Sequence, residues 1–383
     1  MTQEELVRAL QEYDGPECTL MEVCGTHTAA IVKSGIPSLL SGRIHLISGP
    51  GCPVCVTVTS YIDRLVELSL EEHTCVYAFG DLLRVKGSSF SLAGAKAQGG
   101  NVRMVYSPME MLAAARQEPE TTHVFAAVGF ETTAPVYAVL LDEAIRSGCR
   151  NIRLLTSLKT MPQVIRWLCL HNAEGQQESN DGTRDKETTA PGGQQTADAG
   201  EGEDAARRIT GFLAPGHVCA VTGYIDYEKL AEEFGLPFIV SGFEAKDLLA
   251  SIYGLVQARG KGIVRNFYPS VVKREGNPRA EEAVNRFFAP CDAAWRGMGI
   301  IPESGRILRP EYADFDAGSL PLTADQVAGG CRCPDVLMGK LRPYECPMFG
   351  TVCTPQNPNG SCMVSQEGSC YNYYVGGFQR DPA

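Results

Sequence analysis

Cysteine is the residue type in this sequence with the most chemistry to offer. The 383 residues include 15 cysteines, and the acidic amphipathic start, 1–15, lacks the basic and apolar features of an export signal. We therefore expect a reducing compartment, in which thiols are free, redox-active or bound to metal. Six of the cysteines lie near the C-terminus: Cys331, Cys333, Cys346, Cys353, Cys362 and Cys370.

The segment that holds these six cysteines is rich in Pro and Gly, which predicts turns rather than a packed core. Such a segment needs metal or disulfides to stabilise it, and a reducing compartment favours metal. None of the six forms a C-x-x-C pair, the usual spacing of zinc ligands, whereas Fe–S clusters accept four thiolates at uneven spacing. The pattern favours an Fe–S cluster, with structural zinc or ordinary buried thiols as alternatives. Two thiols are then left over for a redox-active dithiol, and spacing does not say which two.

A second group of cysteines stands in Gly-Pro-Gly-Cys-Pro-Val-Cys, directly after an apolar run. We expect Cys52 and Cys55 to lie at a strand-to-helix turn, where the helix N-terminus lowers thiol pKa values and the two sulfurs are close enough to bridge. This pattern is typical of a redox pair. Metal binding with ligands from elsewhere is the alternative.

Cys24 and His27 stand three residues apart in Cys-Gly-Thr-His-Thr. A thiolate and an imidazole in such a turn can bind a metal such as iron and leave coordination positions open. Alternatively, His27 activates Cys24 as a nucleophile, or the pair is structural.

Two further loops carry less specific signals. Glu131 in Gly-Phe-Glu-Thr-Thr could position a metal-bound group or a proton, or the threonines after it, Thr132 and Thr133, could cap a helix. His217 in Pro-Gly-His-Val could bring an imidazole to the same cleft, or be an ordinary turn residue.

Short apolar runs that precede Gly-rich turns alternate with stretches compatible with helix. The expected strands are 44–47, 76–79, 124–128, 152–155 and 238–240, and the expected helices are 60–71, 109–117, 137–147 and 279–288. This alternation favours parallel sheets with crossover helices, whose ligand sites gather at the carboxyl ends of the strands.

The turn motifs recur in similar order in two halves of the chain, which predicts two similar parallel-sheet α/β domains that face a cleft. We expect these domains at 1–140 and 141–275, followed by a small C-terminal Fe–S domain at 276–383. Residues 173–208 include no large apolar residue, so we expect a disordered surface insert there.

Composition excludes several classes of function. A net charge of −11 gives no general attraction to nucleic acid or to anionic lipid. No apolar run is long enough to span a membrane, and no P-loop signature is present. We expect a soluble protein of the cytoplasm that binds neither nucleic acid nor membrane.

Taken together and in order, the motifs around Cys24, Cys52, Glu131 and His217 and the cysteine-rich tail resemble the HypD family of hydrogenase formation proteins. The resemblance implies two related α/β domains around a cleft and a C-terminal domain that holds a [4Fe-4S] cluster. It also implies a maturation factor for [NiFe]-hydrogenase, which with the small chaperone HypC carries the iron on which two cyanides and one carbon monoxide are assembled. HypE would deliver the cyanide, and the hydrogenase large subunit would be an indirect partner.

The resemblance also implies a role for each motif residue. Cys24 would bind the iron with His27 beside it, and Cys52 and Cys55 would form a redox dithiol. Thr26, Thr28 and Glu131 would face the diatomic ligands. The cluster ligands would be Cys331, Cys346, Cys353 and Cys370, leaving Cys333 and Cys362 as a second dithiol. The cluster region is also similar to that of ferredoxin:thioredoxin reductase, which implies electron transfer from cluster to dithiol to iron.

The insert 173–208 departs from the family pattern, where a short connection is expected. The remaining cysteines are expected to be small buried hydrophobes: Cys18, Cys75, Cys149, Cys169, Cys219 and Cys291. Two other functions remain open, a free-standing Fe–S disulfide reductase and a purely structural docking protein.

Overall fold

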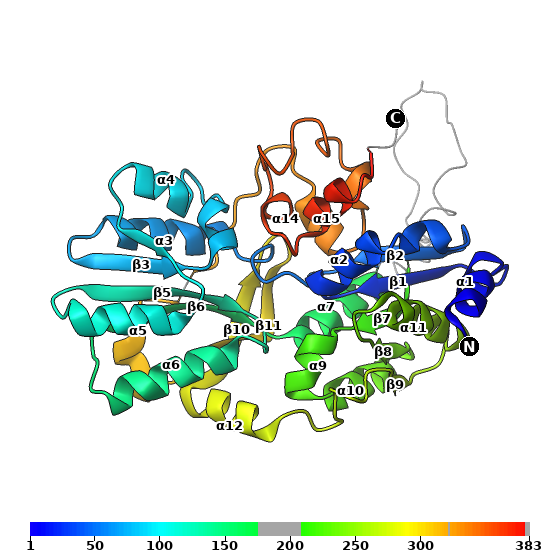
Figure 1. Cartoon of the computed structure of the whole chain (residues 1–383), viewed down its shortest axis with the longest axis horizontal. Helices are drawn as coiled ribbons and strands as arrows, with labels where there is room; N and C mark the ends of the chain where they lie inside the picture. The colour runs from blue at the N-terminus through cyan, green and yellow to red at the C-terminus, as the bar shows by residue number, and fades with distance from the viewer. Residues whose placement is uncertain (175–207, 321, 380–383) are drawn as a thin grey trace, which may run out of the picture.

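The computed structural model describes residues 1–174, 208–320 and 322–379. Nearly all of the expected insert, 173–208, falls outside this part of the chain. The described residues form two β-sheets side by side, each covered by helices, with the C-terminal segment packed over the region between them (Figure 1).

The first sheet is parallel throughout, and its five strands lie in the order β2-β1-β7-β8-β9. The strands are β1 (Cys18–Glu22), β2 (Ile44–Ser48), β7 (Ile209–Ala214), β8 (Phe238–Val240) and β9 (Val264–Asn266). Neighbouring side chains leave opposite faces of a strand, so Leu20 packs with α1, α2 and α11, whereas Met21 packs with α7, α9 and α10. These helices are α1 (Gln3–Gln11), α2 (Gly25–Lys33), α7 (Met161–Glu174), α9 (Gly216–Thr222), α10 (Ile225–Phe234) and α11 (Ala245–Gln257).

The second sheet has six strands in the order β10-β11-β6-β5-β3-β4. They are β3 (Thr74–Ala78), β4 (Val102–Met104), β5 (Thr122–Gly129), β6 (Ile152–Lys159), β10 (Phe288–Trp295) and β11 (Gly299–Leu308). Val76 faces α3 and α4, and Tyr77 faces α5, α6 and α12 on the opposite side. These helices are α3 (Thr59–Leu70), α4 (Leu92–Ala97), α5 (Pro108–Gln117), α6 (Ala134–Arg146) and α12 (Pro278–Phe287).

The strands and helices expected from the apolar runs are all present, with ends that differ by a few residues. The expected parallel pairing holds for β3 to β6, but β11 runs antiparallel to β6, and β10 runs antiparallel to β11. The alternation of strand and helix therefore predicted the α/β class correctly and missed this hairpin.

The two sheets do not follow the expected boundaries at residues 140 and 275. After β2 the chain leaves the first sheet, builds β3 to β6 of the second, and returns so that β7 pairs with β1. The last two strands of the second sheet, β10 and β11, come from the segment 276–383 that was expected to form the Fe–S domain. Turn motifs recur along the chain, but pairing between distant strands decides which sheet each strand joins.

The rest of the chain after β11 has short helices and many turns, as its composition predicts. These elements are η3 (Pro310–Phe315), α13 (Cys333–Leu337), η4 (Pro343–Glu345), α14 (Ser361–Val364) and α15 (Ser369–Val375). α15 packs on α2 of the first sheet. The hydroxyl of Ser365 donates to Asp81 Oδ2 at 2.9 Å, in η2 (Gly80–Arg84) beside the second sheet. The C-terminal segment, orange and red in Figure 1, therefore contacts both halves of the molecule.

A short 3-10 helix, η1 (Ile36–Leu39), follows α2 and precedes β2 along the chain. No helix in the described ranges is both long and apolar enough to cross a membrane.

Candidate functional site

Cys24 lies where β1 ends and α2 begins, as the N-cap residue of that helix. Burial raises the pKa of its thiol to about 12, and the negative charges of Glu22 and Glu367 add to this effect. The backbone N–H groups of His27 and Thr26 oppose it. A cation bound at this buried thiol would favour loss of the thiol proton to solvent, because the positive charge reverses the local electrostatics and stabilises the thiolate.

Glu22 is buried beside Cys24 and accepts hydrogen bonds from two residues of the motif. One carboxylate oxygen accepts from the backbone N–H of Cys24 at 3.1 Å, and the other accepts from the hydroxyl of Thr28 at 2.5 Å. Burial raises the pKa of Glu22 to about 7, and these hydrogen bonds limit the rise. Thr28 therefore holds Glu22 in place and does not present its hydroxyl to a ligand at Cys24.

The loop after β2 packs directly against the loop after β1. The backbone N–H of Gly49 donates to the carbonyl of Glu22 at 2.7 Å, and the N–H of Gly25 donates to the carbonyl of Gly51 at 3.1 Å. A Cβ atom on Gly51 would collide with the backbone of Val23 and Cys24. The absence of a side chain at Gly51 is what allows the two loops to meet.

His27 and His217 come together around one aromatic ring. The ring centroid of Phe243 lies 4.6 Å from that of His27 and 4.0 Å from that of His217. Burial lowers the pKa of His27 to about 4, although the nearby backbone of Ser241 and Gly242 partly opposes this. Neither ring nitrogen of His27 makes a hydrogen bond within the described residues. At neutral pH the site therefore holds an uncharged imidazole with free hydrogen-bonding capacity.

Cys52 and Cys55 form a disulfide in the loop between β2 and α3, so the sulfurs are close, as the C-x-x-C spacing predicts. Both side chains are buried. The expected position at a helix start is wrong, because α3 begins only at Thr59. The helix that follows along the chain therefore does not begin at these sulfurs.

Ser361 connects this disulfide to the cysteines of the C-terminal segment. Its hydroxyl donates to the carbonyl of Cys55 at 2.9 Å, and its own carbonyl lies 3.8 Å from the Cys55 sulfur. The hydroxyl also lies 3.9 Å from the sulfur of Cys333, which in turn is 2.7 Å from the sulfur of Cys362. The two pairs of cysteines therefore share a neighbour and a continuous core.

A cavity of about 340 Å³ is lined by all six C-terminal cysteines. Most of the other lining side chains are apolar, including Val336, Met348, Phe349 and Met363. A Cβ atom on Gly360 would lie 2.5 Å from the sulfur of Cys331, so this glycine leaves room for that sulfur. Several thiols on a mostly apolar wall are the kind of donor set that an Fe–S cluster takes, so the residue types here suit such a group.

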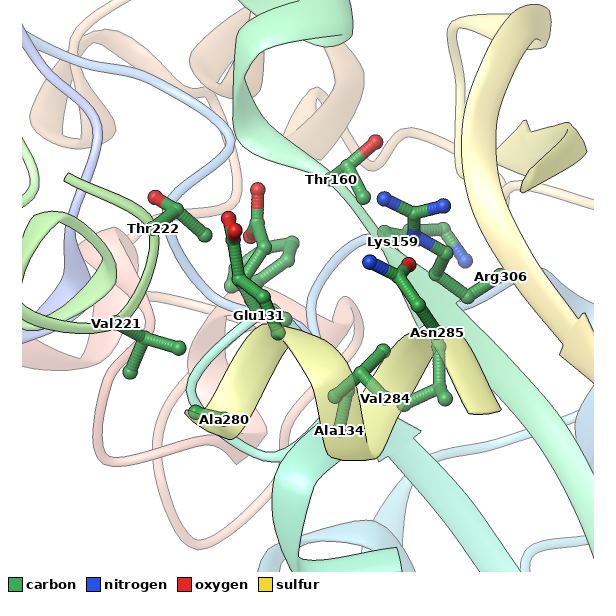
Figure 2. Close-up of a pocket in the computed structure, with 13 residues that line it drawn as sticks. Glu131, Ala134, Lys159, Thr160, Val221, Thr222, Ala280, Val284, Asn285 and Arg306 are labelled. Atoms are coloured by element: carbon green, nitrogen blue, oxygen red, sulfur yellow. The ribbon is translucent and has the colours of Figure 1, made fainter. Parts of the chain in front are cut away.

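Glu131 does not join the residues around Cys24. It lines a pocket of about 450 Å³ together with Lys159, Thr160 and Arg306, at the carboxyl ends of β5 and β6 (Figure 2). Neither Cys24 nor His27 lines that pocket. Thr133 is the N-cap residue of α6, but its side chain makes no capping hydrogen bond.

The chain matches the profile of HypD, described as the hydrogenase formation hypA family, over residues 2–178 and 197–376. The chain belongs to the HypD family. The interruption in the match, at 179–196, lies inside the segment that was expected to depart from the family pattern.

Full-length relatives support this membership of the HypD family. The hydrogenase maturation factor HypD of Escherichia coli K12 is 38% identical, over 93% of this chain and 88% of its own length. HypD of Azotobacter vinelandii is 36% identical, over 94% of this chain and 90% of its own. HypD of Rhizobium leguminosarum is 38% identical, with 94% and 89% covered.

Three residues near these motifs were not predicted from the sequence to belong to the site. Ser361 and Glu367 each stand within three residues of a tail cysteine, a signal that could have drawn attention to them. Cys219 lies two residues after His217 and was expected to be a plain buried hydrophobe. The charge of Cys24 acts on Cys219, and burial together with the charge of Glu131 raises the Cys219 pKa. The charges of both Cys24 and Glu131 therefore reach Cys219.

Proposed function

We propose that this HypD-family chain acts in hydrogenase maturation as a scaffold, on which Cys24 holds an iron ion as cargo while two cyanides and one carbon monoxide are added to it. The surroundings of Cys24 carry the proposal. A thiolate is a soft ligand that suits iron with such diatomic ligands. The carboxylates of Glu22 and Glu367 make a buried cation less costly at this position.

Iron held by Cys24 needs further ligands from outside the chain. Around Cys24, the described residues include no group of three His, Cys, Asp or Glu side chains that could together hold a metal ion. A site with one strong protein ligand leaves several coordination positions for cyanide, carbon monoxide and a partner. We propose that HypC supplies the partner ligand, that HypE delivers cyanide, and that the iron group then passes to the hydrogenase large subunit.

His27 and Thr26 are the side chains best placed to contact the diatomic ligands. The His27 imidazole is buried and uncharged at neutral pH, and its ring nitrogens have no hydrogen bond within the described residues. It can therefore donate one hydrogen bond to a cyanide nitrogen without adding charge to the site. The Thr26 hydroxyl makes a long hydrogen bond, 3.5 Å, to Glu367, which a ligand could replace.

The C-terminal cysteines would carry out the electron transfer that this function needs. We propose that Cys331, Cys346, Cys353 and Cys370 hold a [4Fe-4S] cluster in the cysteine-lined cavity. When bound, such a cluster supplies electrons one at a time. Cys333 and Cys362, whose sulfurs lie close together in the same cavity, would form the second dithiol.

Thiol–disulfide exchange can connect the two pairs of cysteines. A thiolate at Cys333 or Cys362 attacks one sulfur of the Cys52–Cys55 disulfide, forms a mixed disulfide and releases the other sulfur as a thiolate. The remaining thiol of the attacking pair then closes its own disulfide. The net result is a reduced Cys52/Cys55 pair and an oxidised Cys333/Cys362 pair, and Ser361 lies between them.

Hydrogenase activity in cells that lack their own HypD tests the function. Cells that carry Cys24→Ala should have no mature hydrogenase, whereas Cys18→Ala, at a buried cysteine on the strand that leads to Cys24, should support near wild-type activity. Mature hydrogenase with Cys24→Ala would contradict the scaffold. It would favour the alternative of a disulfide reductase, whose turnover of a protein disulfide needs Cys52 and Cys55 but not Cys24.

A further inference from the structure

The pocket around Glu131 lies at the carboxyl ends of two neighbouring parallel strands. Glu131 follows β5, Lys159 ends β6, and Thr160 comes next, with Gly129 and Leu158 paired in register. The carboxyl ends of parallel strands are where α/β sheets commonly bind ligands. We name this space the β5–β6 pocket, lined by Phe130, Glu131, Ala134, Leu158, Lys159, Thr160, Val221, Thr222, Ala280, Glu281, Val284, Asn285 and Arg306.

Polar atoms inside the pocket lack partners. Thr160 is only 5% exposed, and its hydroxyl makes no hydrogen bond within the described residues. One carboxyl oxygen of Glu131 is also buried without a partner, while the other accepts from the backbone N–H of Met161 at 2.8 Å. Buried polar groups are nearly always paired in folded proteins, so two unpaired ones in one pocket point to a ligand.

Positive charge and helix starts favour an anionic group on that ligand. In Figure 2, the Arg306 guanidinium extends from β11 toward Thr160 and Asn285. α6 begins at Ala134 and α7 at Met161, so two helix N-termini lie at the pocket.

The acidic groups nearby limit how much anionic charge the pocket accepts. Asp226 raises the pKa of Glu131 and Arg306 lowers it, but burial is the largest effect and brings this pKa to about 7. Glu281 also lines the pocket. A single negative charge at the Arg306 end is therefore easier to accommodate than the multiple charge of a phosphate.

One part of the wall is apolar. Ala134, Val221, Ala280 and Val284 come from three different helices and enclose the space beside Glu131. Apolar walls with a few convergent polar groups are typical of small-molecule sites. We propose that the β5–β6 pocket binds a small organic carboxylate, with its carboxylate held by Arg306 and the Thr160 hydroxyl and its aliphatic part against the apolar wall.

Isothermal titration calorimetry of the full chain, at constant ionic strength, tests this assignment with acetate, butyrate, bicarbonate and phosphate as probes. Butyrate should bind saturably and more tightly than acetate, because its longer alkyl chain also packs against the apolar wall. Arg306→Gln and the isosteric Thr160→Val should each weaken butyrate about tenfold or more, the effect of losing a hydrogen bond to a charged group. Arg265→Gln, an exposed strand arginine on β9, is the matched control and should bind as the wild type does.

Three results would overturn the proposal: no saturable binding of either carboxylate, equal binding by all three variants, or tighter binding of phosphate or bicarbonate than of butyrate. Thr160→Val only replaces a hydroxyl by a methyl group of similar size. If Arg306→Gln fails to fold, the affinity of Thr160→Val for butyrate therefore still decides between the two outcomes. Cys24→Ala should bind butyrate like the wild type. The carboxylate site is therefore tested independently of the proposal that Cys24 holds iron.

Discussion

Gly51 supports the backbone of Cys24 directly, with its carbonyl accepting from the N–H of Gly25 and with no space for a Cβ atom against Cys24. The loop that carries the Cys52–Cys55 disulfide is thereby fixed to the residue proposed to hold iron. A movement of this loop on reduction or oxidation of the disulfide would reach Cys24 through these contacts.

Gly51→Ala should displace Cys24 and reduce the iron bound at it. Overpacking of this kind costs about 1–3 kcal/mol of stability, so the protein should still fold while its non-cluster iron falls well below that of the wild type. Anaerobic iron analysis together with thermal unfolding checks this. Gly42→Ala, at a position with open space around it, is the matched control. Normal iron in Gly51→Ala would show that this contact does not position Cys24.

Thr28→Val should destabilise the fold more than Thr26→Val. The Thr28 hydroxyl donates to the buried carboxylate of Glu22, and its loss removes a hydrogen bond from this buried group, at a cost of about 1–3 kcal/mol. The Thr26 hydroxyl makes a long hydrogen bond, 3.5 Å, to Glu367, so its loss should cost less. Urea unfolding of the two isosteric variants measures the difference. Equal midpoints would mean that the Glu22 carboxyl does not depend on Thr28.

Ser361→Ala should slow electron delivery to the Cys52–Cys55 disulfide. The hydroxyl that contacts both Cys55 and Cys333 is lost, so the exchanging sulfurs are held less well together. Anaerobic mixing with dithionite, followed by alkylation and mass spectrometry, should show disulfide reduction slowed by about tenfold, the effect of roughly 1.4 kcal/mol. Ser147→Ala, which also loses a hydroxyl bonded to a backbone carbonyl but on the exposed end of α6, should reduce at the wild-type rate. An unchanged rate in Ser361→Ala would contradict this route.

Lys159→Met should stabilise the protein in a pH-dependent way. Burial lowers the pKa of Lys159 to about 7 from the ordinary 10.5. Below pH 7 the folded state must bury a charged ammonium; between pH 7 and 10.5 the unfolded state alone is protonated, so wild-type stability rises with pH. The gain in Tm from Lys159→Met should therefore be largest at pH 6 and small near pH 10. A gain that is independent of pH would show that burial does not shift the pKa of Lys159.

Local features of this fold were predictable from the sequence, and the sorting of strands between sheets was not. The run Phe238–Val240 forms β8 as expected, because a buried parallel strand needs only a short apolar run between turns. The pairing of β1 with β7 joins residues about 190 positions apart, and no local pattern reports such a contact. The same holds for the site: Cys24 and Cys52 stand in recognisable motifs, but their contact through Gly51 depends on the adjacent positions of β1 and β2.

Residues whose role comes from packing alone were the hardest to predict. Glu131 was expected beside the iron because it stands in a polar turn after a strand, but β5 belongs to the second sheet and directs it into the β5–β6 pocket. Cys219 carries no sequence signal that separates it from a core residue. Its position within reach of the charges of both Cys24 and Glu131 results from the return of the chain to the first sheet through β7.

The infrared spectrum of the anaerobically purified complex with HypC tests the central claim most directly. The wild type, taken from cells competent in hydrogenase maturation, should show C≡N and C≡O stretching bands and contain iron beyond that of a four-iron cluster. Cys24→Ala should lose the bands and the additional iron, and it should keep the cluster iron and the Cys52–Cys55 disulfide. Bands that persist in Cys24→Ala, or a wild-type complex with cluster iron but no such bands, would contradict the assignment of Cys24 as the iron ligand.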